Sequence, residues 1–195
     1  MMNHFAEWRD TVIEKVAELK RTDKKFRFFG ARKHRYTFDA PISIAEAEQF
    51  EHTYAIQLPA EYKYFITQIG NGGAGPYYGV RPLQDFQAHY VHHEVELPAM
   101  DLHKPFPAHY WLNENETRIT KEIVQQSVFG TMSICEEGDG YNHLLVVAGD
   151  EKGYIWFDGS VTDQGMIPFS MPEKERFTFF DWYESWLNMA FDELF

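Results

Sequence analysis

This chain has almost no cysteine and no long apolar run. A single cysteine, Cys135, among 195 residues excludes an internal disulfide framework and a cysteine-rich zinc site. No charge-poor run of apolar residues is long enough to cross a bilayer, and the opening "MMNHFAEWRD" carries charge where a signal peptide would be apolar. We therefore expect a cytoplasmic protein that is neither inserted in a membrane nor secreted.

Basic residues are scarce after the first forty positions. Residues 1–40 contain ten Lys/Arg and six Asp/Glu, a balance of +4, whereas residues 41–195 contain eight Lys/Arg and 24 Asp/Glu, a balance of −16. An acidic body repels nucleic acid and membrane phosphates and attracts basic proteins. It also keeps a protein soluble, so charge alone leaves open whether the acidity serves binding.

Catalytic and nucleotide-binding motifs are lacking as well. Neither Gly-x-Ser-x-Gly nor His-Glu-x-x-His occurs, and Cys135 lies in a predicted strand, where a small buried thiol is commoner than a nucleophile. The glycine-rich "QIGNGGAGPYYG" (68–79) follows a predicted helix and precedes a predicted strand, the reverse of a phosphate-binding loop. We interpret it as a structural turn and expect no enzyme activity and no cofactor.

Two clusters of titratable residues could have either a functional or a purely structural role. His89, His92, His93 and Glu94, with His103 and His109 nearby, could bind a metal, but nothing in the loop-like stretch 84–127 fixes three of them on one point. We therefore predict no metal site, and the role of the His-rich segment 89–109 stays open. The carboxylates of Glu136, Glu137 and Asp139 could serve acid–base chemistry, but in a predicted hairpin turn they are more often solvated charges.

Helical spacing of apolar residues predicts helices at the beginning and end of the chain. The first shows one apolar face made of Phe5, Trp8, Val12, Val16 and Leu19. Ser43 and Glu46 form a capping-box signature for a helix that ends near Tyr54. In "LPAEYKYFITQIG" Pro59 suits a first helical turn, and Gly70 stands where a left-handed cap belongs. A last helix, from Thr178, should pack on a sheet.

The second half of the chain changes to a β pattern. After a short predicted strand in "PYYGV" (76–80), four β-rich runs cover 128–135, 143–149, 153–159 and 166–171, and acidic or glycine-rich turns divide them. Short turns between such runs favour an antiparallel meander. Helices in front, strands behind and a closing helix predict one α+β domain, in which the meander packs against the N-terminal helices and the C-terminal helix.

Three stretches together resemble the SMI1/KNR4 family of the SUKH superfamily. They are "LPAEYKYFITQIGNGGAGPYYGVRPL", "GYNHLLVVAGDEKGYIWFDGS" and "FFDWYESWL". The positions that carry the resemblance are mostly fold-defining: Leu58, Pro59, Tyr62, Phe65, Asn71, Gly72, Gly73, Tyr78, Gly79, Gly153, Trp156 and Asp158. It divides the chain into an N-terminal helix with a charged connector, 1–27, and a SUKH-like domain, 28–195. The stretch before residue 25 and the His-rich region 84–110 are less characteristic of the family, so the choice of partner could lie there.

The resemblance implies a binding function. Bacterial members are similar to immunity proteins, which are encoded beside polymorphic toxins and neutralise the toxin by binding it. Many such toxins are nucleases with basic clefts, which an acidic protein could occlude without touching nucleic acid or a membrane itself. The alternative is a non-catalytic regulatory or scaffold module, the role that some eukaryotic relatives are thought to fill. The oligomeric state stays open.

A protein-binding surface needs aromatic anchors at its centre and charge at its rim. The candidate anchors are Tyr77, Tyr78 and Trp156, although Trp156 lies between Ile155 and Phe157 on a predicted strand and is as readily a core residue. The candidate carboxylates that would attract a basic toxin are Glu136, Glu137, Asp139, Asp150, Glu151, Asp158 and Asp163. For any single carboxylate, a solvated surface position is the commoner role.

Overall fold

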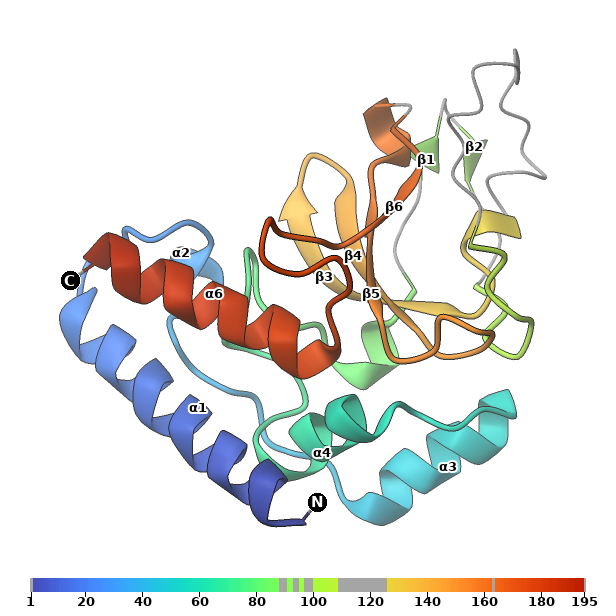
Figure 1. The fold of residues 1–195 in the computed structure, drawn as a ribbon. Helices are drawn as coiled ribbons and strands as arrows, with labels where there is room; N and C mark the ends of the chain where they lie inside the picture. Colours follow the sequence, from blue (N-terminus) through green and yellow to red (C-terminus); the bar gives the residue numbers. More distant parts are fainter. Residues whose placement is uncertain are drawn as a thin grey trace.

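The fold separates helices from a four-stranded antiparallel sheet, and it also contains a two-stranded antiparallel sheet (Figure 1). The structure is a computed structural model, and it describes residues 2–87, 91–92, 95–96, 100–108, 126–162 and 164–194. The helices are α1 (Met2–Thr22), α2 (Ala31–His34), α3 (Ile44–Tyr54), α4 (Ala60–Gln68) and α6 (Phe179–Leu194), with 3-10 turns η1 (Leu83–Asp85) and η2 (Ser160–Thr162). The strands are β1 (Val91–His92), β2 (Val95–Glu96), β3 (Thr131–Gly138), β4 (Tyr141–Val146), β5 (Ile155–Asp158) and β6 (Met166–Pro168). The predicted α+β class is confirmed.

The meander β3-β4-β5-β6 is antiparallel throughout, as predicted. One turn is shorter than expected, because β3 continues through Glu136 and Glu137 and only Asp139 and Gly140 connect it to β4. Both connecting residues have positive φ, 52° and 89°, as a tight two-residue hairpin with an Asp-Gly sequence requires. The prediction that Glu136 and Glu137 lie in a turn is therefore wrong: the ladder to β4 extends over them, with bulges in β3.

Two local predictions around the glycine-rich segment are also wrong. Residues 76–80 form a turn and no strand, since Tyr77 (φ 48°) and Gly79 (φ 97°) are not extended and only isolated bridges join Val80 to Gly73 and Cys135. Gly70 is not a left-handed cap, because α4 ends at Gln68, its C-cap is Ile69 with φ −121°, and Gly70 itself has no positive φ. A Cβ at Gly70 would lie 2.8 Å from the carbonyl oxygen of Asp39, so glycine is needed there for close packing.

The predicted capping box of α3 is confirmed, and so is the buried face of α1, in which Trp8, Val12, Val16 and Leu19 are at most 4% exposed. The Ser43 hydroxyl accepts from the Glu46 backbone N–H, and the Glu46 carboxylate accepts from the Ser43 backbone N–H. At the start of α6, Asp181 accepts from the backbone N–H and the hydroxyl of Thr178. Such reciprocal bonds satisfy backbone donors that have no partner within the helix.

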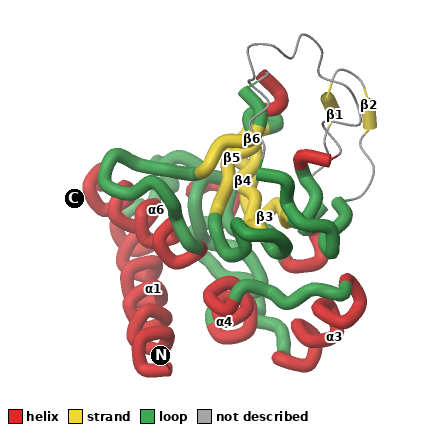
Figure 2. Tube along the Cα trace, turned by 45° about the vertical axis from the view of Figure 1, so that its right-hand side comes forward, coloured by secondary structure: helices red, strands yellow, loops and turns green. Residues whose placement is uncertain are grey.

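The first and last helices lie side by side and run in the same direction, and both figures show the pair (Figures 1 and 2). The buried face of α1 meets α6 where the rings of Trp8 and Phe180 stack with centroids 3.7 Å apart. The pair covers α4, where Phe65 lies 5.3 Å from Tyr183. Hence α1 belongs to the same hydrophobic core as the rest of the fold.

The sheet buries side chains on both faces. On the face toward α6, His143 of β4 lies among aromatic rings and bonds to Trp182. On the opposite face, Trp156 of β5 packs edge-on against Phe106 at 4.8 Å. The sheet therefore lies between two packed layers, and Asp139 and Gly140 at the tip of the β3–β4 hairpin are exposed.

Candidate functional site

Three aromatic side chains gather beside the β3–β4 hairpin. Phe29 is 56% exposed, and its ring stacks on Tyr78 with centroids 5.9 Å apart and meets Tyr77 edge-on at 6.1 Å. The backbone N–H of Tyr78 donates to the carbonyl oxygen of Glu136 at 3.2 Å, which fixes the 76–79 turn against β3. The large apolar ring of Phe29 is thus exposed to solvent and packs against the rings of Tyr77 and Tyr78.

Two glycines allow this close approach. Gly30 has φ 81°, and a Cβ there would lie 1.5 Å from the carbonyl oxygen of Tyr77. Gly138 has φ 113°, and a Cβ there would lie 3.0 Å from the Tyr78 hydroxyl. Because glycine has no side chain, the segment before α2 and the end of β3 can both come into contact with the turn that contains Tyr77 and Tyr78.

A second apolar side chain flanks the tip of the hairpin. Val161 of η2 is 43% exposed and lies over Gly140, and the Tyr141 hydroxyl donates to Thr162 Oγ1 at 3.2 Å. We call this region the hairpin surface and define it by seven residues: Phe29, Tyr77, Tyr78, Glu136, Glu137, Asp139 and Val161. The structure therefore brings together five of the ten residues predicted to bind a partner, Tyr77, Tyr78, Glu136, Glu137 and Asp139.

The three carboxylates of the hairpin surface differ in what they already bind. Glu136 pairs with Arg81 at 3.1 Å, while Glu137 binds Nε2 of His143 at 3.1 Å. Asp139, at the tip of the hairpin, is exposed. The hairpin is therefore less acidic than its sequence indicates, because one of its three charges is offset by Arg81.

His143 is completely buried, with a relative exposure of 0%. Trp182 Nε1 donates to Nδ1 of His143 at 3.0 Å. Burial lowers the pKa of His143, and the Glu137 carboxylate partly opposes that effect. The imidazole is consequently neutral at neutral pH and joins α6 to the hairpin surface.

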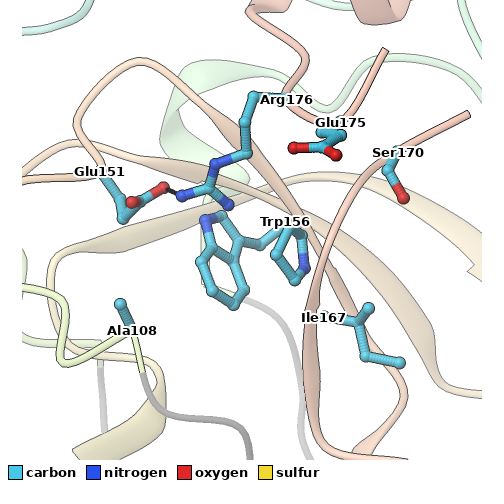
Figure 3. Close-up of a pocket in the computed structure, with 8 residues that line it drawn as sticks. Ala108, Glu151, Trp156, Ile167, Ser170, Glu175 and Arg176 are labelled. Carbon is cyan, nitrogen blue, oxygen red and sulfur yellow. Dashed lines mark ion pairs between the residues drawn. The ribbon is translucent and has the colours of Figure 1, made fainter. Parts of the chain in front are cut away.

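Two other predicted residues lie around a pocket beside the sheet (Figure 3). This open pocket has a volume of about 530 Å³, and its lining includes Glu151, Trp156 and Arg176. Arg176 pairs with Glu151 and lies 5.2 Å above the Trp156 ring. Trp156 is only 1% exposed, so it packs as a core residue and offers little surface to a protein partner. Asp150, next to this pocket, is exposed.

The remaining predicted carboxylates do not join the hairpin surface. Asp158 is 1% exposed, and it accepts from the Ser160 backbone N–H at 3.0 Å and from the Ser160 hydroxyl. It therefore supports the turn after β5. Asp163 lies outside the described residues, and so do His89, His93, Glu94 and His109 of the His-rich segment. Of the other two histidines of that cluster, His92 is described by its backbone, and His103 pairs with Asp101.

The glycine-rich segment and Cys135 have structural roles. Asn71 accepts from the Leu83 backbone N–H at 2.9 Å, and Gly72 and Gly73 have φ of 107° and 98°. The Cys135 thiol is completely buried and donates to the Pro76 carbonyl oxygen at 3.1 Å, and burial raises its pKa. A thiol in this environment is not a nucleophile at neutral pH.

Phe29, Val161 and His143 were missed by sequence reasoning. Phe29 lies in "KKFRFFG", directly after the charged connector predicted over 1–27, and nothing in this run marks one of its aromatic residues as exposed. His143 looked like an ordinary strand residue, and Val161 like part of a turn. Their roles depend on contacts with distant segments, which no local pattern contains.

An exposed aromatic residue that adjoins acidic ones, as Phe29 does here, suits a protein-binding surface. The chain belongs to the SMI1 / KNR4 family (SUKH-1), whose pattern matches residues 41–189. Comparison with curated proteins and with solved structures gave no match. Over the described part of the chain, no helix is both long and apolar enough to cross a membrane.

Proposed function

We propose that this protein is an immunity protein that binds a cognate polymorphic bacterial toxin through the hairpin surface and thereby neutralises it. Membership of the SMI1/KNR4 family is consistent with this role. The observation that carries the proposal is Phe29, an aromatic side chain that is 56% exposed beside an acidic hairpin.

An exposed aromatic ring of this kind suits a binding anchor. Tyr77 and Tyr78 support Phe29 from two directions, so the ring loses little conformational freedom when a partner covers it. Residues that dominate binding energy are commonly aromatic and lie near the centre of a contact. Asp139 at the rim adds a charge that favours a basic partner.

The toxin is a nuclease in this proposal. Nucleases bind phosphates through Lys/Arg, and a formal net charge of −12 attracts such a surface. The immunity protein would occlude the substrate-binding face without any chemical step. Protection should therefore be stoichiometric, with growth restored only when the immunity protein matches the toxin in amount.

The test is binding to the toxin domain encoded by the neighbouring gene, purified with its catalytic residue replaced. We expect Phe29→Ala to raise Kd by at least about 30-fold, the value of an anchor residue. Ile44→Ala is the matched control, since Ile44 on α3 is 55% exposed and lies outside the hairpin surface. Equal Kd values for both variants would exclude the hairpin surface as the binding site.

Growth assays distinguish immunity from the alternative functions. If trace amounts of the protein rescued cells from excess toxin, an enzymatic role would replace simple binding. If no neighbouring toxin gene existed and the protein bound only host proteins, the regulatory or scaffold role would be favoured.

A further inference from the structure

We infer that Glu137 and Tyr77 form a preorganised receptor for an arginine side chain of the partner, and that buried His143 is the positioning residue. The identity of the partner rests on the proposed function, whereas the receptor itself is argued from side chains of this chain. The chemical class of the ligand is a guanidinium group.

The orientation of Glu137 is set by a hydrogen-bonded chain that starts in α6. An indole N–H can only donate, so the contact from Trp182 Nε1 makes Nδ1 of His143 an acceptor. The proton of the neutral imidazole must then be on Nε2, which donates to Glu137 Oε2 at 3.1 Å. Every hydrogen bond in the chain therefore has a defined direction, and it ends in a carboxylate that acts as an acceptor.

The imidazole cannot turn away from this arrangement. Four aromatic rings surround it, with centroid distances of 4.9 Å to Tyr77, 5.8 Å to Phe157, 5.2 Å to Phe169 and 5.8 Å to Trp182. Because His143 has no exposed surface, moving it would open a cavity in the core. Glu137 is thus held from the buried side.

The outer side of Glu137 is accessible. Its side chain is 32% exposed, and within the described ranges only His143 bonds to it, through Oε2. Glu136 makes the contrast, because Arg81 already binds its carboxylate at 3.1 Å. The hairpin thus carries one carboxylate paired with an internal arginine and, beside it, one that pairs with no Lys or Arg among the described residues.

A guanidinium fits this site better than an ammonium does. It is planar, donates two parallel N–H bonds and stacks on aromatic faces, whereas an ammonium is a strongly hydrated point charge. The centroid of the Tyr77 ring lies 4.9 Å from that of the His143 ring, which binds Glu137, and the Glu137 charge adds to burial in raising the pKa of Tyr77. A carboxylate held beside a phenol ring offers both contacts at a small cost in conformational entropy.

The receptor can be tested without the toxin. We propose to titrate the protein with N-acetyl-arginine amide and to follow the indole N–H resonance of Trp182 in NMR spectra. The resonance should shift and saturate, because this N–H is linked to Glu137 through the hydrogen bonds of His143. Trp182→Phe assigns the signal among five tryptophans. N-acetyl-lysine amide should bind several-fold more weakly, and the uncharged N-acetyl-citrulline amide should cause no shift.

Two variants of equal charge separate a specific contact from general attraction. Glu137→Gln should weaken arginine binding at least about tenfold, the loss expected for a charge-assisted bond. Asp139→Asn removes the same charge two residues away at an exposed position and should change affinity less than about twofold. If the two variants weakened arginine binding equally, the proposed arginine receptor would be wrong.

Two variants of His143 test the positioning role. In His143→Gln the amide N–H can still reach Glu137, whereas in His143→Asn the shorter side chain can accept from Trp182 but does not reach Glu137. Both should lose stability in thermal melts, but only His143→Asn should weaken arginine binding several-fold. Equal weakening by both variants would show that His143 acts only through stability, and the positioning role would be wrong.

The outcomes also separate the receptor from the proposed function. Arginine binding that depends on Glu137, without protection against the neighbouring toxin, would support the receptor and refute the immunity role. Protection that survives Glu137→Gln, together with no arginine shift, would refute the receptor and leave the immunity role in place.

Discussion

At the level of single residues, Gly73 and Gly153 have similar positive φ values but differ in the space available for a Cβ atom. Substitutions at the two positions therefore distinguish the cost of backbone strain from the cost of a steric clash. Gly73 (φ 98°) has no room for a Cβ, which would lie 2.4 Å from the Thr37 carbonyl oxygen, whereas a Cβ at Gly153 (φ 94°) would meet nothing within 4 Å. We predict that Gly153→Ala costs about 1 kcal/mol of unfolding free energy from backbone strain alone. Gly73→Ala should cost clearly more in the same urea titrations.

Gly72→Val extends the comparison to a β-branched side chain. Gly72 has φ 107°, and a Cβ there would lie 3.0 Å from the Val80 carbonyl oxygen. The loss should therefore exceed about 1 kcal/mol. An unchanged urea midpoint for Gly72→Val or Gly73→Ala would contradict the structural role of the glycine-rich turn.

His34 makes stability depend on pH. It is 7% exposed, its Nδ1 accepts from the Tyr36 backbone N–H at 3.0 Å, and burial lowers its pKa from 6.5 to about 4. Above pH 6.5 neither state binds the proton; as pH falls toward 4, the unfolded chain binds it and the folded chain does not. We predict a loss of about 3 kcal/mol over this window.

His34→Asn is the variant that checks this prediction, because its amide oxygen can still accept from Tyr36 and does not titrate. Its unfolding free energy should fall less than that of the wild type between pH 6.5 and about 4. The pKa of buried His143 is also lowered, so part of the slope should remain. The carboxylates of Asp23 and Asp181, whose pKa values are lowered from 3.8, lose their contribution only at more acidic pH.

At the scale of elements, local signals predicted the helices and the order of the meander strands. Capping residues such as Ser43 and Thr178 act within one turn, so their effect can be read from neighbouring letters. The 76–80 segment failed because its aromatic residues favour a strand, while contacts with Gly30 and β3 hold Tyr77 at positive φ. Tertiary contacts overrode β propensity there.

The candidate site could be predicted only in part, because several of its residues are brought together by tertiary contacts. Tyr77 and Tyr78 stand out as paired aromatics in a turn, and Glu136, Glu137 and Asp139 stand out as an acidic run. Phe29 joins them only because Gly30 lets two distant loops touch. No local pattern reveals that Arg81 offsets Glu136 or that His143 holds Glu137.

The first helix is expected to be indispensable, although it precedes the family match, which begins at residue 41. Trp8 is 4% exposed and stacks on Phe180, so Trp8→Ala should cost about 3–5 kcal/mol. Ile13→Ala, on the same helix but 44% exposed, should change stability by less than about 0.5 kcal/mol. Removal of residues 1–27, the segment predicted as separate, should abolish cooperative thermal unfolding. Undiminished cooperativity would show that residues 28–195 fold alone.

At the scale of the whole molecule, the formal net charge of −12 should act mainly on association kinetics. Exposed charges are screened beyond about 8 Å at physiological salt, so added salt should slow capture of a basic toxin much more than it speeds release. Glu136 and Glu137 are poor reporters, because each has an internal partner. Neutralising the exposed Asp139, Asp150 and Glu173 together should reduce the association rate several-fold.

The control for this charge experiment lies in the basic front end of the chain. Changing the exposed Lys24, Lys25 and Arg27 to Gln should not slow capture of a basic toxin. Neither triple variant should move the melting midpoint much, since exposed charges contribute little to folding. If the association rate did not depend on salt, or if both triple variants reduced it equally, the acidic surface would serve solubility. Recognition would then depend on apolar contacts.

The stack of Trp8 on Phe180 also sets a time order during synthesis on the ribosome. The apolar face of α1 emerges early, but part of its cover, α6, consists of residues 179–194. Contacts between segments so far apart in the chain form slowly, because closing a long loop costs entropy before any contact compensates for it. We expect the nascent chain to expose the apolar face of α1 until residues 179–194 have been synthesised, which makes it a client for chaperones that shield apolar helices.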